Sequence, residues 1–251
     1  MRQKMPKFLI PCLGVMLALA VAFVAMPAAA QEFSLDFGEG GSATARIIQL
    51  VLLVAVISIA PSLLVMVTSF TRIIIVLSFV RTAIGTQTSP PNQVLVAMAL
   101  FLTLFIMAPV FEKSYNDGLL PMINEEVTEE EGIKRAAEPF RGFMLTHVRE
   151  KDLRLFMDIR DITVEKPEQT PYEVLIPAFM ISELRRAFEI GFLIFIPFLI
   201  IDMLVASILM AMGMMMLPPV IISLPFKLIF FVLIDGWYML VGSLVRSFGP
   251  V

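Results

Sequence analysis

Long apolar stretches alternate with polar links along this chain. The apolar stretches cover residues 47–80, 94–111, 187–217 and 220–245, and proline, glycine or a charged residue interrupts each of them. A helix needs about 20 predominantly apolar residues to cross the hydrocarbon core of a bilayer. The pattern predicts an all-α protein in which four apolar segments form two membrane-type helical hairpins.

The first apolar stretch is longer than one span requires. A single helix over residues 47–80 would be about 50 Å long at 1.5 Å per residue, against a hydrocarbon core of about 30 Å. The sequence therefore predicts either a break near Pro61 or Arg72, or a helix that extends beyond the bilayer.

The links inside the two hairpins share one spacing. They are Gly85-TQTS-Pro90-Pro91 and Gly213-MMML-Pro218-Pro219, both of the form G-x-x-x-x-P-P. Glycine ends a helix in a left-handed conformation, and proline suits the first position of the next helix. The shared spacing indicates either an internal repeat or two tight hairpins that independently use the same turn residues.

Residues 112–186 form a polar region that carries most of the acids. Thr128 and Glu131 have the spacing of a capping box, which predicts a helix that begins after Thr128. Apolar residues then recur at helical spacing, at Ile133, Ala137, Phe140, Met144 and Val148. Such a stripe favours burial against the same chain or a neighbouring copy.

The first thirty residues resemble a signal peptide. Basic residues precede an apolar run, and Pro27 then leads into three alanines and the polar Gln31. An uncleaved anchor is the alternative. A cleaved leader places the mature N-terminus outside. The link bearing Arg72 and Arg81 then lies inside, in agreement with the positive-inside rule, and the polar region and the C-terminus lie outside. The predicted divisions are residues 1–30, a flexible 31–46, a hairpin 47–111, the polar region 112–186 and a hairpin 187–251.

Cleavage of the leader is directly testable. We expect the mature protein to begin at Gln31, because Ala28 to Ala30 supply the small residues of a cleavage site. N-terminal sequencing of the assembled protein that returns an intact Met1 would contradict this expectation.

Composition narrows the function classes. The chain is 58% hydrophobic and only 16% charged, whereas soluble domains carry about 25% charged residues. Its net charge of −3 does not favour nucleic-acid binding. The only cysteine, Cys12, lies in the leader, and the only histidine, His147, has no H-E-x-x-H motif around it. The sequence therefore predicts no catalytic residue, cofactor or metal site.

Charged residues inside the apolar segments each require a partner. These residues are Lys227 and the intramembrane acids Asp202 and Asp235, and a charge at the bilayer centre costs about 2.5–3.5 kcal/mol on insertion scales. Before the third segment, ELRRAFE permits pairs between Arg185 and Glu189 and between Glu183 and Arg186. Those pairs leave Lys227 without an assigned acid. Two aspartates in apolar segments are also a feature of aspartyl intramembrane proteases, but the G-x-G-D motif of those enzymes is missing here. A channel or transporter subunit for a small solute is the other alternative, because broken helices and charges at the membrane midplane fit it.

Three long blocks resemble the FliP family of flagellar biosynthesis proteins. They are TSFTRIIIVLSFVRTAIGTQTSPPNQVLVAMALFLTLFIMAPV, PAFMISELRRAFEIGFLIFIPFLIIDMLVASILMAMGMMMLPP and LPFKLIFFVLIDGW. The resemblance covers nearly the whole chain after the leader. It implies a non-enzymatic core subunit of the flagellar type III export gate, in the inner membrane and the flagellar basal body. It also implies a homopentamer that assembles with FliQ and FliR, near FlhB and FlhA, and that passes unfolded flagellar subunits.

The resemblance also assigns roles to particular residues. It implies that Glu183 pairs with Lys227 of the adjacent subunit, and that Met214, Met215 and Met216 form a gasket in the pore. Consecutive helical residues point about 100° apart, so three methionines between Gly213 and Pro218 are more consistent with a loop. Methionine suits a deformable apolar seal, although filling of an irregular core is the alternative.

Overall fold

The computed structural model describes residues 43–86, 88–164, 166–214 and 216–249. These residues form helices and short loops without a strand, which confirms the all-α prediction. The chain divides into two units within its first described helix, between Val54 and Ala55, and the packing below is that of the second unit. The predicted signal peptide, its cleavage site and most of the flexible segment lie outside the described residues.

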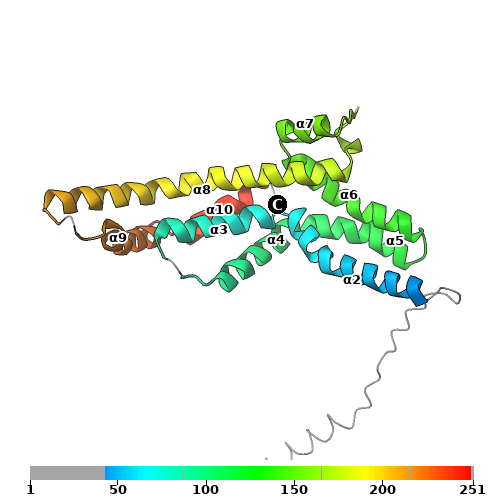
Figure 1. The fold of residues 1–251 in the computed structure, drawn as a ribbon, viewed down its shortest axis with the longest axis horizontal. Coiled ribbons are helices and arrows are strands. Elements are labelled where there is room, and N and C mark those ends of the chain that lie inside the picture. Colours follow the sequence, from blue (N-terminus) through cyan, green and yellow to red (C-terminus); the bar gives the residue numbers. More distant parts are fainter. Residues whose placement is uncertain (1–42, 87, 165, 215, 250–251) are drawn as a thin grey trace, which may run out of the picture. The chain divides into compact units, whose positions relative to one another are not determined.

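The helices follow one another along the chain as drawn in Figure 1. They are α2 (Ala43–Met66), α3 (Phe70–Ile84), α4 (Asn92–Ser114), the π-helical η1 (Tyr115–Leu119), α5 (Leu120–Ile123), α6 (Glu129–His147), α7 (Glu150–Ile159), the 3-10 helix η2 (Pro167–Gln169), α8 (Tyr172–Ala211), α9 (Pro219–Leu233) and α10 (Gly236–Arg246).

The overlong first stretch breaks beside Arg72 and not at Pro61. Pro61 lies inside α2, whereas the chain leaves the helix after Met66 and re-enters it at Phe70. At the break the Thr68 hydroxyl accepts a hydrogen bond from the Phe70 N–H at 3.4 Å. The buried Arg72 follows within the first turn of α3, so the break separates an exposed apolar helix from one that carries a buried charge.

The central helix of the first core is α3. It packs against α8, α4 and α9, and its buried residues recur at the spacing of one helical face: Ile73, Val76, Leu77, Val80, Ala83 and Ile84. Gly191 on α8 permits a close approach to α3, because a Cβ there would lie 2.6 Å from the Phe79 ring. Residues of α4, α9 and α10 complete this core.

The longest helix, α8, has 40 residues and is therefore about 60 Å long. Its first part packs on α6 and α7 around a second core that contains Met144 and Phe179, and its later part packs on α3 and α9. The helix crosses the division predicted between residues 186 and 187 without interruption. As a statement about membrane topology, that division stays a prediction.

The polar region is helical, and α6 begins where the capping box predicts. The Thr128 hydroxyl accepts a hydrogen bond from the Glu131 N–H at 3.4 Å. The Glu131 carboxylate instead accepts from Nε of Arg135 at 3.0 Å, so only half of the box forms. That hydrogen bond holds the pKa of Glu131 below its ordinary value. The stabilisation is therefore present at neutral pH and is lost as the pH falls through the lowered pKa.

Gly118 in η1 touches the backbone of α6, and its replacement by alanine should be destabilising. A Cβ at Gly118 would lie 2.4 Å from the backbone nitrogen of Ala136, which no side-chain rotation relieves. We expect a loss of about 1–3 kcal/mol in the free energy of unfolding. Gly142→Ala on α6 is the matched control, because a Cβ there meets nothing within 4 Å. Equal thermal unfolding temperatures for the two variants would contradict this expectation.

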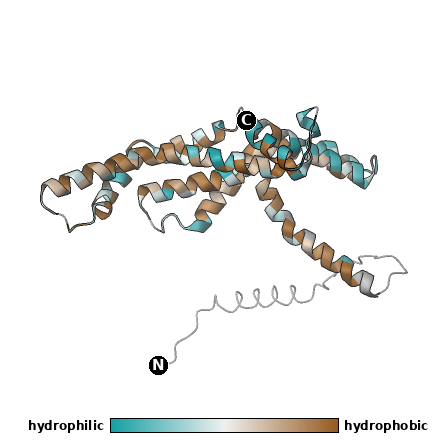
Figure 2. Ribbon diagram, turned by 45° about the horizontal axis from the view of Figure 1, so that its top comes forward, coloured by the Kyte–Doolittle hydropathy of each residue, from teal (hydrophilic) through white to brown (hydrophobic). Residues whose placement is uncertain are grey.

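By length and apolar composition, three described helices are able to cross a membrane. They are Ile47–Met66, Asn92–Ile123 and Tyr172–Ala211, and α9 with α10 gives a fourth if this pair, bent by 63°, counts as one span. Figure 2 shows hydrophobic colour along α2 and much of α8, and hydrophilic colour concentrated in the polar region. The chain is thus built of membrane-type helices with a polar helical part between them.

Candidate functional site

Both hairpin turns place glycine in the left-handed conformation. The φ angle is 89° at Gly85, after α3, and 76° at Gly213, after α8; glycine adopts such angles without a Cβ penalty. In the pair Pro218-Pro219 the second proline is the first residue of α9, whereas in Pro90-Pro91 the second proline is the cap before α4. The two turns therefore share their glycine geometry but differ by one position at the outgoing helix.

Met214 and Met216 lie in the turn after Gly213 and not in a helix. Met214 donates its backbone N–H to the carbonyl of Leu209 at 3.0 Å, which closes the end of α8. Met216 is 98% exposed, and Met215 lies outside the described residues. A fully exposed thioether at the tip of an apolar hairpin is available to a molecule outside this chain.

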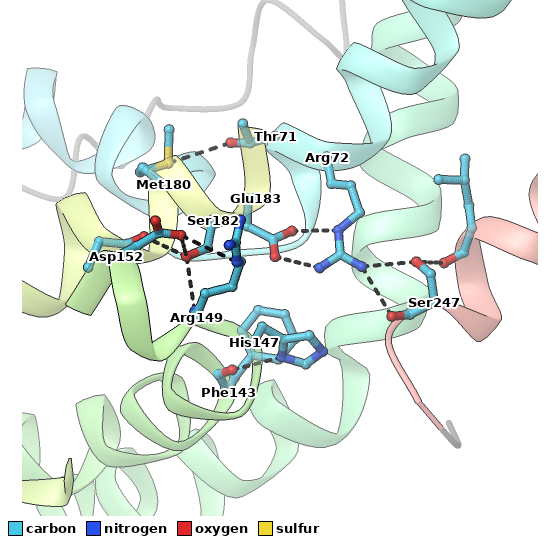
Figure 3. Close-up of polar contacts among 12 residues, drawn as sticks. Thr71, Arg72, Phe143, His147, Arg149, Asp152, Met180, Ser182, Glu183 and Ser247 are labelled. Carbon is cyan, nitrogen blue, oxygen red and sulfur yellow. Dashed lines mark hydrogen bonds and ion pairs between the residues drawn. The ribbon is translucent and has the colours of Figure 1, made fainter. Parts of the chain in front are cut away.

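A buried ion pair joins α3 to α8. Arg72 is 1% exposed and Glu183 0% exposed. Nε of Arg72 donates to Oε2 of Glu183 at 2.7 Å, and its Nη2 donates to Oε1 (Figure 3). This is the bidentate arrangement in which a guanidinium binds a carboxylate most strongly.

The end of the chain completes the coordination of Arg72. Its Nη1 donates to the backbone carbonyl of Ser247 at 3.1 Å and to the Ser247 hydroxyl at 3.0 Å. The Phe248 ring centroid lies 3.7 Å from the guanidinium carbon, at cation–π distance. Three segments far apart in sequence thus meet at one guanidinium.

Sequence reasoning missed this pair. The predicted partners of Glu183 were Arg186 and Lys227 of an adjacent subunit, because Arg72 was considered only as an interruption of an apolar stretch. The alternative pair of Arg185 and Glu189 is present at 2.9 Å on the exposed side of α8, whereas Glu183 faces α3. The pair between Glu183 and Lys227 of an adjacent subunit stays a prediction, since it concerns a second copy.

Within the chain, Asp202 supplies the acid for Lys227. Nζ of Lys227 donates to Oδ2 of Asp202 at 2.6 Å and to the carbonyl of Ala83 at 3.2 Å. The Ser223 hydroxyl donates to the other carboxylate oxygen of Asp202. The lysine thereby ties together α8, α9 and the end of α3. This pair could have been predicted from the sequence, because Asp202 and Lys227 lie at nearly equal distances before and after the turn and therefore face each other in an antiparallel hairpin.

The two aspartates in apolar segments occupy different surroundings. The carboxylate of Asp202 is held by Lys227 and Ser223. Asp235 is exposed at the break between α9 and α10 and has a φ of 51°. No hydrogen bond links the two carboxylates among the described residues, whereas the carboxylates of an aspartyl protease share a proton.

A second polar cluster joins the start of α7 to α8. The Ser182 hydroxyl donates to the Asp152 carboxylate at 2.7 Å and accepts from the Arg149 N–H at 3.0 Å (Figure 3). His147 is buried beside it, with Nδ1 2.8 Å from the carbonyl of Phe143 and its ring 5.4 Å from that of Phe248. His147 is therefore a packed residue. In the part of the chain that the structure describes, no group of three His, Cys, Asp or Glu side chains is placed to hold a metal ion.

Comparison with known proteins gives one consistent result. The model of the FliP family matches residues 53–244. Three relatives named flagellar biosynthetic protein FliP illustrate the similarity. The protein of Caulobacter vibrioides is 54% identical over 233 residues, which cover 91% of this chain and 88% of the relative. That of Bacillus subtilis is 54% identical over 219 residues, or 86% and 97% of the two chains. That of Agrobacterium fabrum is 50% identical over 240 residues, or 92% and 98%. Since the family model matches most of the chain and the relatives are covered nearly end to end, the chain belongs to the FliP family of flagellar biosynthetic proteins.

Proposed function

We propose that this chain is a core pore subunit of the flagellar protein export gate, which passes unfolded flagellar subunits across the inner membrane. Membership of the FliP family supports the pathway. The structural observation that supports a pore role is the methionine-bearing turn, where Met216 is 98% exposed at the tip of an apolar hairpin. An exposed apolar turn suits contact with moving cargo or with copies of itself.

The exposed apolar surface favours assembly over an isolated monomer. On the later part of α8, Phe192 and Leu193 are each 66% exposed and Met203 is 63% exposed. Such a surface requires lipid or protein cover. We propose that copies of this chain, in a homopentamer together with FliQ and FliR and near FlhB and FlhA, supply much of it. The polar region then lies on the periplasmic side of the inner membrane, in the flagellar basal body.

The proposed pore closes with methionines. A ring of turns would bring several thioether side chains to one axis, where they exclude water without any charge, since hydrophobic constrictions gate by dewetting. Methionine is unbranched and flexible, so such a seal would repack around unlike cargo segments. In the proposal Gly213 lets the chain reverse, and Met214, Met215 and Met216 line the constriction.

Deletion of this chain tests the function as a whole. We expect cells that lack it to secrete no flagellar hook or filament protein, and we expect plasmid-borne wild-type chain to restore secretion. Blue-native electrophoresis should show the chain in one large complex with other small membrane proteins. Normal secretion in the deletion strain would favour the small-solute channel or transporter and would overturn the proposal.

The methionine seal has its own test. Replacing Met214, Met215 and Met216 together with alanine should leave the complex assembled but make the membrane leak small ions. The shorter alanine side chains would leave the proposed constriction wider, so that water and ions could pass through it. Secretion should fall only modestly, since cargo still fits. The matched control replaces Met203, Met210 and Met212, which are exposed methionines on α8 or at its end. Equal ion conductance of the two triple variants would show that the turn is packing and not a seal.

A further inference from the structure

An apolar groove of about 330 Å³ lies between α8, α9 and α10. This volume is within the range of small-molecule pockets, about 300–1,000 Å³. Its walls are almost wholly aliphatic and aromatic, and they include Ile190, Pro197, Phe198, Phe231, Met239 and Leu244. Ile234 and Gly236, which lie at the 63° bend between α9 and α10, also line the groove. The groove is distinct from the methionine turn and from both buried ion pairs.

Two arginines extend the groove at one end. Arg186 precedes Ile190 by four residues and Leu193 by seven, so it continues the groove-lining face of α8 by one turn. Arg246 follows Ser243 by three residues and Met239 by seven, so it continues the lining face of α10 in the same way. Each wall therefore changes from apolar to cationic at its end.

The two arginines lie at the same end of the groove. Ser247, next to Arg246, accepts a hydrogen bond from Arg72, and Arg72 pairs with Glu183, three residues before Arg186 (Figure 3). This chain of contacts sets the C-terminus of α10 level with that part of α8. Helical register therefore places both residues, although neither lines the groove itself, beyond the same end of it.

The charge of Arg186 acts on Glu189 and Arg72 without a direct ion pair among the described residues. Its neighbour Arg185 is held by Glu189 at 2.9 Å, whereas Arg186 forms no ion pair with a described residue and is half-buried. Arg246 folds back along α10, where its Nε donates to the carbonyl of Gly242 at 3.1 Å. The remaining donors of both guanidinium groups suit an anion with several oxygens.

We propose that this groove binds an anionic phospholipid, with an acyl chain between α8, α9 and α10 and the headgroup phosphate at Arg186 and Arg246. The apolar walls match a hydrocarbon chain, and the paired cations match its phosphate, as basic pockets between membrane helices do in general. Apolar groove and cationic mouth together fit a single amphipathic ligand. A protein segment could occupy the groove instead only if it had an apolar stretch followed by an acidic residue that reaches the two arginines.

The chain contains its own reporter for this test. Trp237 is the only tryptophan in the sequence, and its ring centroid lies 5.3 Å from that of Phe231, which lines the groove. A brominated acyl chain in the groove would therefore quench its fluorescence. The full chain is placed in phosphatidylcholine nanodiscs that contain a small fraction of brominated phosphatidylglycerol or of brominated phosphatidylcholine.

We expect brominated phosphatidylglycerol to quench Trp237 at a mole fraction about 25-fold lower than brominated phosphatidylcholine, since each of the two arginines contributes about fivefold and the two factors multiply. The double variant Arg186→Gln, Arg246→Gln should remove this preference, and Arg185→Gln should retain it. Ser243→Phe, which fills the groove from an exposed position, should reduce quenching by the anionic lipid and decides the matter if the double variant does not fold. Equal quenching by the two lipids in the wild type would overturn the proposal. So would an unchanged preference for the anionic lipid in both the double arginine variant and Ser243→Phe.

Discussion

Glu183→Ala should destabilise this protein by about 3–5 kcal/mol, because it leaves the Arg72 guanidinium buried without a carboxylate. Arg72 is 1% exposed, so water cannot replace the lost partner. Ser247 and Phe248 would still contact the guanidinium, but neither carries a negative charge. A loss of that size is a large fraction of the 5–15 kcal/mol that stabilises a typical protein, and we expect little folded chain to accumulate.

The same helix offers the control. Glu189→Ala removes an acid from α8 whose partner Arg185 is 54% exposed, and exposed pairs contribute about 0–1 kcal/mol. Thermal unfolding or protease resistance of the detergent-extracted chain would compare the two variants. If Glu183→Ala is as stable as Glu189→Ala, the Arg72 pair does not stabilise the fold.

Charge exchange separates the pair within the chain from the predicted pair between subunits. If Arg72 is the partner of Glu183 in the assembly, Arg72→Glu with Glu183→Arg should recover some of the complex that each single change loses. If Lys227 of the adjacent subunit is the partner, Glu183→Lys with Lys227→Glu should recover it instead. Complex size on blue-native gels would decide between the two partnerships.

Local signals in the sequence were sufficient for the helical class and for several helix ends, but not for the break between α9 and α10. Apolar periodicity and length predict the hairpins, glycine at 85 and 213 predicts where helices stop, and Thr128 predicts where α6 begins. Each of these signals depends on backbone preferences within a few residues. The division at residue 186 had no such signal. The division was placed where the sequence changes from polar to apolar. Such a change does not end a helix, and α8 continues across it from Tyr172 to Ala211.

The two buried ion pairs could not be predicted from local signals, unlike the exposed pair of Arg185 and Glu189. Arg72 and Glu183 are separated by 111 residues, and only the packing of α3 on α8 brings them together. The turn at Gly213 does place Asp202 opposite Lys227, so this pair was within reach of antiparallel hairpin geometry. The contact of Ser247 with Arg72 depends on the bend between α9 and α10, which follows a left-handed Asp235 that sequence alone does not signal.

Asp202→Ala should cost more stability than Lys227→Ala, although both variants break the same pair. The survivor differs: the Lys227 side chain is 4% exposed, whereas that of Asp202 is 28% exposed. An ammonium left in the core without an acid costs about 3–5 kcal/mol. In Lys227→Ala the remaining Asp202 carboxylate still accepts a hydrogen bond from the Ser223 hydroxyl and is partly exposed. Its loss of a partner therefore costs less.

The double variant Asp202→Leu, Lys227→Met tests what the pair contributes beyond stability. Replacing both members of a buried pair with apolar residues of similar volume is often neutral or stabilising, because no charge then remains to be desolvated. We therefore expect the double variant to unfold at or above the wild-type temperature while Asp202→Ala unfolds well below it. Lys227 also donates to the carbonyl of Ala83 at the end of α3, so the double variant loses the polar link between the two hairpins. Its secretion should fall although its fold is intact, if that link sets the position of the methionine turn relative to the turn at Gly85. Wild-type secretion in a stable double variant would show that the pair serves only to neutralise a buried lysine.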